Sequence, residues 1–159
     1  MSDFLTLLAK HQARAPVNVI GFAHDLGIKV WTSNKLGSDI SGKLFKDGSL
    51  GGESGYAIVV NGSHPEVRQR FTIAHEIAHF ALHRSAVGNG ISDNEFYRSA
   101  LSNKQETEAN KLAAEILMPY ALMKQIKDEQ HLADGNANEL ARQLKVSEIA
   151  MKIRLGINF

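Results

Sequence analysis

The order of hydrophobic and polar positions along the chain predicts helices, then a small sheet, then helices again. Near the N-terminus, Phe4, Leu7 and Leu8 recur at helical spacing, which is typical of an amphipathic helix. A second helix is predicted to open at Pro16 and to end before Gly27, because proline is tolerated in a first turn and glycine suits a helix end. Both helices precede the first segment with a strand pattern.

Three short segments, 28–32, 43–45 and 56–60, are rich in β-branched and aromatic residues and predict strands. The glycine-rich stretch 47–55 separates the last two. We therefore expect a small, mainly antiparallel sheet of about three strands. The strand at 56–60 is a candidate edge for pairing with an extended substrate, and an ordinary half-buried strand is the alternative.

Longer helical patterns follow the sheet. Ser63 and Glu66 have the spacing of a capping box, which predicts a helix from about 64 to 83. A loop is expected at 84–102. Further helices are predicted at about 103–118, 119–129, 136–144 and 147–155, with Ser147 as the cap of the last. This order of elements favours an α+β fold in which the C-terminal helices at 136–155 belong to the same domain.

Composition and charge narrow the function classes. The chain has 159 residues, a formal net charge of +1 and no cysteine. Its length suits one domain, and its charge gives no reason to expect direct binding to nucleic acid or an anionic membrane. The lack of cysteine excludes disulfides and thiolate zinc sites. No apolar run approaches the ~20 residues that span a bilayer, and Asp3 stands where a signal peptide carries basic residues, so we expect a cytoplasmic protein.

The predicted helix at 64–83 carries an H-E-x-x-H pattern, made of His75, Glu76 and His79. Residues four apart share a helix face with Cβ atoms roughly 5–6 Å apart, so two imidazoles can bind one zinc ion. Glu76 lies about 100° further round the helix, where a general base can take a proton from water beside the ion. Two ligands and a base on one helix predict a zinc peptidase. Histidines without a metal are the alternative interpretation.

A third zinc ligand has to come from another element, because His83 lies about 12 Å along the helix axis from His75. For His83 we favour a helix-end residue that interacts with the last carbonyls. The best source is the next long helix, where Glu106 leads and Glu108 is the alternative. Asn110 shares a face with Glu106 and could orient its carboxylate, whereas Glu108 points about 200° away.

Three segments of the chain match the motifs of a known family. Residues 70–83 fit the pattern R-F-T-x-A-H-E-x-x-H-x-x-L-H, and residues 106–119 fit E-x-x-A-N-x-x-A-x-x-x-L-M-P. Residues 140–155 fit the pattern L-A-x-x-x-x-V-S-x-x-A-x-x-x-R-L. The chain therefore resembles the ImmA/IrrE family of metallo-endopeptidases over about residues 16–156.

The resemblance implies a single zincin-like domain over residues 1–159, with the H-E-x-x-H helix at its centre. It implies one zinc ion per chain, held by His75, His79 and Glu106, with Glu76 as the catalytic residue. The implied activity is endopeptidase cleavage of a helix-turn-helix repressor or antitoxin encoded nearby, which relieves repression. A non-enzymatic zinc-binding module, or a toxin that pairs with such a partner, is the alternative.

In the expected reaction, zinc polarises the scissile carbonyl and acidifies a water, while Glu76 takes the proton and delivers it to the leaving amine. An oxyanion also needs a hydrogen-bond donor. The candidates are Tyr56, Tyr97, His83 and Arg70, and their sequence positions do not choose among them. For both tyrosines packing is the favoured role, and for Arg70 a structural ion pair. Helices at 139–155 resemble a helix-turn-helix pair, but their mild charge favours a packed hairpin over DNA binding.

Overall fold

The chain forms two helices, three strands, and then a series of helices that one further short strand interrupts. The computed structural model describes residues 2–87, 90–92 and 102–157. The first helices are α1 (Ser2–His11) and α2 (Val19–Asp25). The strands are β1 (Lys29–Ser33), β2 (Gly42–Lys46), β3 (Tyr56–Asn61) and β4 (Gly90–Ser92). The remaining helices are α3 (Glu66–Leu82), α4 (Arg84–Val87), α6 (Asn103–Leu117), α7 (Tyr120–Gln130), α8 (Ala137–Leu144) and α9 (Glu148–Leu155). The predicted α+β class is confirmed.

The described strands form one mixed sheet in the order β1-β3-β2-β4. β1 runs parallel to β3, while β2 is antiparallel to both β3 and β4. The three predicted strands are present, and two of the three pairings are antiparallel, as expected. β4 lies in the segment that was predicted to be a loop. The suggestion that β3 is a free edge is wrong, because β3 pairs on both sides.

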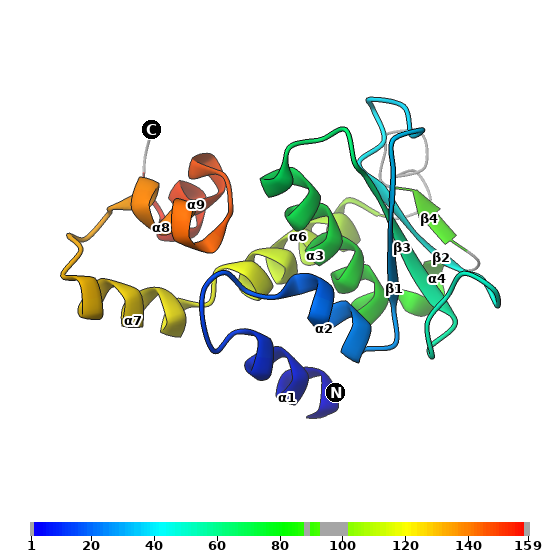
Figure 1. Cartoon of the computed structure of the whole chain (residues 1–159), viewed down its shortest axis with the longest axis horizontal. Coiled ribbons are helices and arrows are strands. Elements are labelled where there is room, and N and C mark those ends of the chain that lie inside the picture. Colours follow the sequence, from blue (N-terminus) through cyan, green and yellow to red (C-terminus); the bar gives the residue numbers. More distant parts are fainter. Residues whose placement is uncertain (1, 88–89, 93–101, 158–159) are drawn as a thin grey trace.

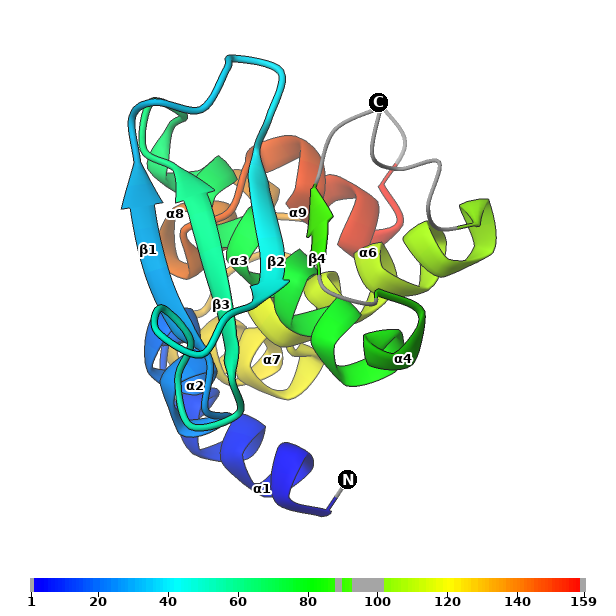
Figure 2. The same cartoon turned by 90° about the vertical axis from the view of Figure 1, so that its right-hand side faces the viewer.

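The central place of β3 explains its sequence. Tyr56 to Val60 is an almost unbroken apolar run, which is typical of a strand that is buried on both faces. Five of the six residues of β3 are buried, whereas β2 alternates buried and exposed residues over its first three positions. Figures 1 and 2 show helices α2 and α3 on one side of the sheet. The core therefore lies between this face of the sheet and the helices.

Helix α3 begins later than the capping-box pattern predicts. Its N-cap is Pro65, and no side chain caps it. The Ser63 amide instead donates to the Asn61 side-chain carbonyl at 2.9 Å, which forms a local turn at the end of β3. Asn61 is fully buried and also donates to the Ile40 carbonyl at 2.9 Å. A buried asparagine therefore orders the turn that leads from β3 towards α3, and the predicted Ser63–Glu66 capping box is absent.

Helix α3 has more buried residues than any other helix that the structure describes. Every residue from Thr72 to Phe80 is buried, and the helix packs against both β2 and β3 and along α6. Ala74 and Ala78 on α3, and Ala109 and Ala113 on α6, have no exposed surface. Small side chains on both helices allow their backbones to approach closely. The predicted central position of the H-E-x-x-H helix is confirmed.

Helices α8 and α9 pack against each other at the end of the molecule away from the sheet (Figure 1). Ser147 caps α9 as predicted, because its hydroxyl accepts from the Ala150 amide at 3.0 Å. Arg70 of α3 donates to the Lys145 carbonyl between the two helices at 3.2 Å. Arg154 of α9 donates to the Met118 carbonyl at 2.9 Å. Arginine side chains therefore attach the C-terminal pair to α3 and α6. None of the described helices is long and apolar enough to cross a membrane.

Candidate metal centre

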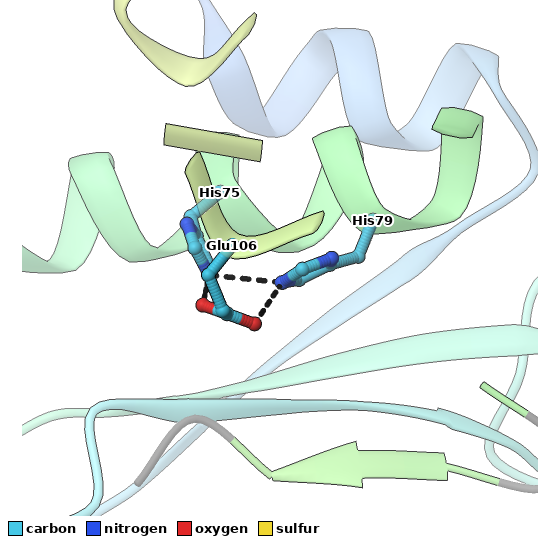
Figure 3. Close-up of side chains that lie close together, drawn as sticks. All are labelled: His75, His79 and Glu106. Atoms are coloured by element: carbon cyan, nitrogen blue, oxygen red, sulfur yellow. Dashed lines mark hydrogen bonds and ion pairs between the residues drawn. The ribbon is translucent and has the colours of Figure 1, made fainter. Parts of the chain in front are cut away.

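Two adjacent helices bring three polar side chains together in the core. His75 and His79 project from successive turns of α3, and Glu106 projects from the first turn of α6 (Figure 3). The two Nε2 atoms lie 3.0 Å apart. Glu106 reaches both rings, with Oε1 at 3.0 Å from His79 Nε2 and Oε2 at 3.3 Å from His75 Nε2. The side chains are 1% (His79), 5% (His75) and 18% (Glu106) exposed, so the cluster is largely shielded from water.

The spacing of these atoms fits a metal ion. One ligand atom from each residue can be chosen so that all lie within 4.8 Å of one another. Tetrahedral zinc with bonds of ~2.0–2.1 Å separates its ligand atoms by about 3.3 Å, close to the three distances here. Two imidazole nitrogens and one carboxylate oxygen form a donor set used by catalytic zinc sites, which keep a fourth position open. The described residues therefore contain a site that could hold a divalent metal.

The local electrostatics keep these groups in the forms that bind a metal. Burial lowers the pKa of His79 more than its hydrogen bond with Glu106 raises it. Burial raises the pKa of Glu106, but hydrogen bonds with His75 and His79 outweigh this and hold it well below its ordinary value. A neutral imidazole presents a lone pair, and an ionised carboxylate supplies negative charge. The cluster is therefore suited to a cation at neutral pH.

The structure separates the two glutamates between which the sequence left a choice. Glu106 contacts both histidines of the cluster, whereas Glu108 turns to His83. Asn110 has no hydrogen bond to Glu106 among the described residues and lies at an exposed position in a groove with Phe71. The expectation that Asn110 orients the carboxylate is thus not met in this structure. Glu76 has no exposed surface.

Among the oxyanion candidates, Tyr56 and Arg70 both have contacts that give them structural roles. Tyr56 is buried with its ring edge-on to Phe80 at 5.3 Å between centroids, so packing accounts for it. Arg70 donates to the Val17 and Lys145 carbonyls, which is a structural role, although through hydrogen bonds rather than the expected ion pair. Tyr97 lies outside the described residues. None of the described candidates is therefore assigned to the oxyanion by its contacts.

His83 is placed differently from the sequence expectation. Its ring turns back along α3, and its Nδ1 lies 3.0 Å from Nδ1 of His79. Its side chain therefore meets another histidine rather than the last carbonyls of the helix. The four-residue spacing from His79 was the signal in the sequence, because residues four apart share a helix face. His83 is not one of the three residues that could share an ion.

A buried H-E-x-x-H helix beside a glutamate from a second helix is the arrangement of a metallopeptidase centre. Residues 23–156 match the peptidase family M78, described as the IrrE N-terminal-like domain. This match covers most of the chain, so the protein belongs to that family. The family and the cluster of His75, His79 and Glu106 together support a metallopeptidase. No curated protein matches the sequence.

The fold is also similar to that of a solved structure. A Mycobacterium tuberculosis transcriptional regulator aligns with a TM-score of 0.62 and 15% sequence identity. The alignment covers 98% of this chain and 47% of the regulator, so the chain spans about half of the length of that protein. At this identity the likeness shows the shared fold alone.

Proposed function

We propose that this chain is a zinc-dependent endopeptidase that binds one zinc ion through His75, His79 and Glu106 and uses Glu76 as its general base. The observation that carries the proposal is the approach of the Glu106 carboxylate to within 3.0–3.3 Å of both Nε2 atoms. A structural metal site would need these ligands but not a fully buried acid at the position after His75. Membership of a peptidase family supports the same conclusion.

The reaction is hydrolysis of a peptide bond. A bound zinc ion supplies Lewis acidity, which polarises the scissile carbonyl and acidifies water. Glu76 accepts one proton from the attacking water as the new C–O bond forms. It then gives that proton to the amine nitrogen as the C–N bond breaks, so that the carboxylate is restored. Burial keeps Glu76 away from bulk water.

The substrate we propose is a helix-turn-helix repressor or antitoxin encoded near this protein. The proposal rests on the resemblance to the ImmA/IrrE family. The protein with a similar fold is described as a transcriptional regulator, which fits a link to gene regulation. Cleavage of such a repressor relieves repression and implies that the protein acts in the cytoplasm.

We also propose that residues 1–159 act as one zincin-like domain. The side chain of Arg70 supports this, because it donates to the Val17 carbonyl at 2.8 Å and to the Lys145 carbonyl at 3.2 Å. One residue of α3 thereby contacts both the link between α1 and α2 and the link between α8 and α9. The Gln12 side chain adds a second link, from the end of α1 to the Ile116 carbonyl of α6 at 3.0 Å.

The test is co-expression of the chain with the helix-turn-helix protein encoded beside it. We expect the partner to be cleaved by the wild type and to stay intact with the Glu76→Gln variant, which keeps the size of the side chain and removes the base. Zinc content should be the same in both proteins. Glu66→Gln is the matched control, because Glu66 lies on the same helix but its side chain is 66% exposed. That control should cleave like the wild type.

An intact partner with both the wild type and the Glu76→Gln variant would overturn the peptidase proposal for that partner. If the intact partner also co-purified with the chain, the non-enzymatic interaction module would be the better account. Cleavage by the Glu76→Gln variant at the wild-type rate would instead remove Glu76 from the mechanism.

A further inference from the structure

Helix α3 continues beyond the metal cluster to a third buried histidine. His83 is the C-cap residue of α3 and is only 6% exposed. Its backbone amide donates to the His79 carbonyl at 2.8 Å, and its Nδ1 lies 3.0 Å from Nδ1 of His79. Main chain and side chain of His83 therefore both contact His79.

The second ring nitrogen of His83 faces an acidic side chain. His83 Nε2 is buried and lies 3.5 Å from Glu108 Oε1. The Glu108 side chain is 46% exposed, so it connects the buried ring to the surface. Glu106, His79, His83 and Glu108 thus form a continuous series from the metal cluster outward. This series joins two helices, because both glutamates belong to α6 and both histidines lie at the C-terminal end of α3.

Metal binding at His79 would fix the direction of the hydrogen bond between His79 and His83. A neutral imidazole has one nitrogen with a proton and one with a lone pair. If Nε2 of His79 presents its lone pair to a metal, Nδ1 of His79 carries the proton and donates to Nδ1 of His83. His83 then carries its own proton on Nε2, which lies 3.5 Å from Glu108 Oε1, within ion-pair distance although the two atoms form no hydrogen bond in this structure. Each ring nitrogen therefore has one definite role.

We infer that His83 is a positioning residue for the metal ligand His79, and that Glu108 holds the tautomer of His83. The inference rests on the proposed zinc site. A metal-ligating histidine usually donates its second N–H to a carboxylate, a carbonyl or water, and this bond fixes the ring and its tautomer. Here Nδ1 of His83 is that acceptor, and the Glu108 carboxylate lies on the far side of the His83 ring. His83 thereby supports zinc binding without contacting the ion.

The test is the zinc affinity of purified variants, measured by competition with a chromophoric chelator. Loss of such a hydrogen bond typically weakens metal binding roughly 10- to 100-fold. We expect a loss of this size for His83→Leu, which removes the acceptor and keeps an apolar side chain. His83→Asn should restore most of the affinity, because its carbonyl oxygen can occupy the position of Nδ1. Glu108→Ala should weaken binding less than His83→Leu does, since water can replace a half-exposed carboxylate.

His24→Leu is the matched control, because the His24 side chain is 87% exposed and belongs to α2. Its zinc affinity should equal that of the wild type. Equal losses for His83→Leu and His83→Asn would mean that His83 acts only through packing, and this would overturn the inference. Wild-type affinity in the His83→Leu protein would overturn it as well, and wild-type affinity in Glu108→Ala would remove Glu108 from it. A wild-type protein that binds no zinc would instead overturn the proposed metal site itself.

Discussion

Replacing Arg70 by methionine tests whether one side chain of α3 holds the N-terminal and the C-terminal helix pairs in place. The guanidinium donates from Nη2 to the Val17 carbonyl at 2.8 Å and from Nε to the Lys145 carbonyl at 3.2 Å. Arg70 also lies five residues before His75 on the same helix. Methionine keeps an unbranched stem of similar length and removes every donor. The substitution therefore isolates the two hydrogen bonds.

The magnitude follows from the surroundings of each bond. The bond to Lys145 is exposed, so water replaces it at little cost. The bond to Val17 is part-buried, and a hydrogen bond from a charged donor contributes about 1.5–3 kcal/mol. Val17 keeps a second donor, the Val19 amide at 3.0 Å, so its carbonyl is not left without a partner. Burial also lowers the pKa of Arg70, because a charged guanidinium is less stable away from water. We therefore expect a loss of about 2 kcal/mol.

The assay is thermal unfolding followed by circular dichroism, with a chelator in every sample so that bound metal does not alter the comparison. For a chain of this length, a loss of about 2 kcal/mol lowers Tm by roughly 4–8 °C. Arg14→Met is the control, because Arg14 lies at an exposed position and its side chain makes no hydrogen bond among the described residues. A wild-type Tm for Arg70→Met, or an equal drop for Arg14→Met, would refute the reasoning.

Three further predictions concern the core, a close backbone approach and metal linkage. Leu140→Ala should lower the free energy of unfolding by about 3–5 kcal/mol in urea, because Leu140 is fully buried in α8; a surface-like loss of about 0.5 kcal/mol would contradict this packing. Gly52→Ala should lower Tm because its Cβ would lie 2.3 Å from the Gly27 carbonyl oxygen, while Gly48→Ala, which meets nothing within 4 Å, should not. Free zinc at a hundred times its Kd should stabilise the wild type by about 2.7 kcal/mol. The His79→Ala protein should gain nothing from it, and an equal gain in both proteins would contradict the site.

The local part of the site could be predicted because helix geometry fixes it. Four-residue spacing alone puts His75 and His79 on one face of α3, and the structure has both rings at one cluster. The same reasoning separated Glu106 from Glu108, since about 200° of rotation lies between them. In the structure the two carboxylates do contact different histidines. Their roles as ligand and supporting group stay predictions.

The long-range part of the fold was less accessible to this reasoning. Strand order depends on pairing between distant segments, so the sequence of residues 56–60 does not identify β1 and β2 as the neighbours of β3. The unbroken apolar run was the available signal for a central strand. The start of α3 was predicted wrongly for a related reason. Ser63 has the right spacing for a capping box, but its backbone amide donates to the side chain of the buried Asn61 from the preceding strand.

The partners of surface groups on α6 were also beyond the sequence pattern. Asn110 has the spacing that would allow it to support Glu106, yet it lies in the groove formed with Phe71 and Ile153. The way in which α6 packs against α3 decides this, and that packing joins segments far apart in the sequence. The contact between His83 and Glu108 depends on the same packing. Periodicity identifies a helix face but does not fix what lies opposite each position on it.

Zinc content is the most direct test of the account. The purified wild type should contain one zinc ion per chain by elemental analysis, and a variant with both His75→Ala and His79→Ala should contain none. Circular dichroism of the variant in the presence of chelator would show that it is folded. The account predicts loss of the metal together with loss of these two rings, which lie 3.0 Å apart at Nε2. A folded double variant with the same zinc content as the wild type would contradict it.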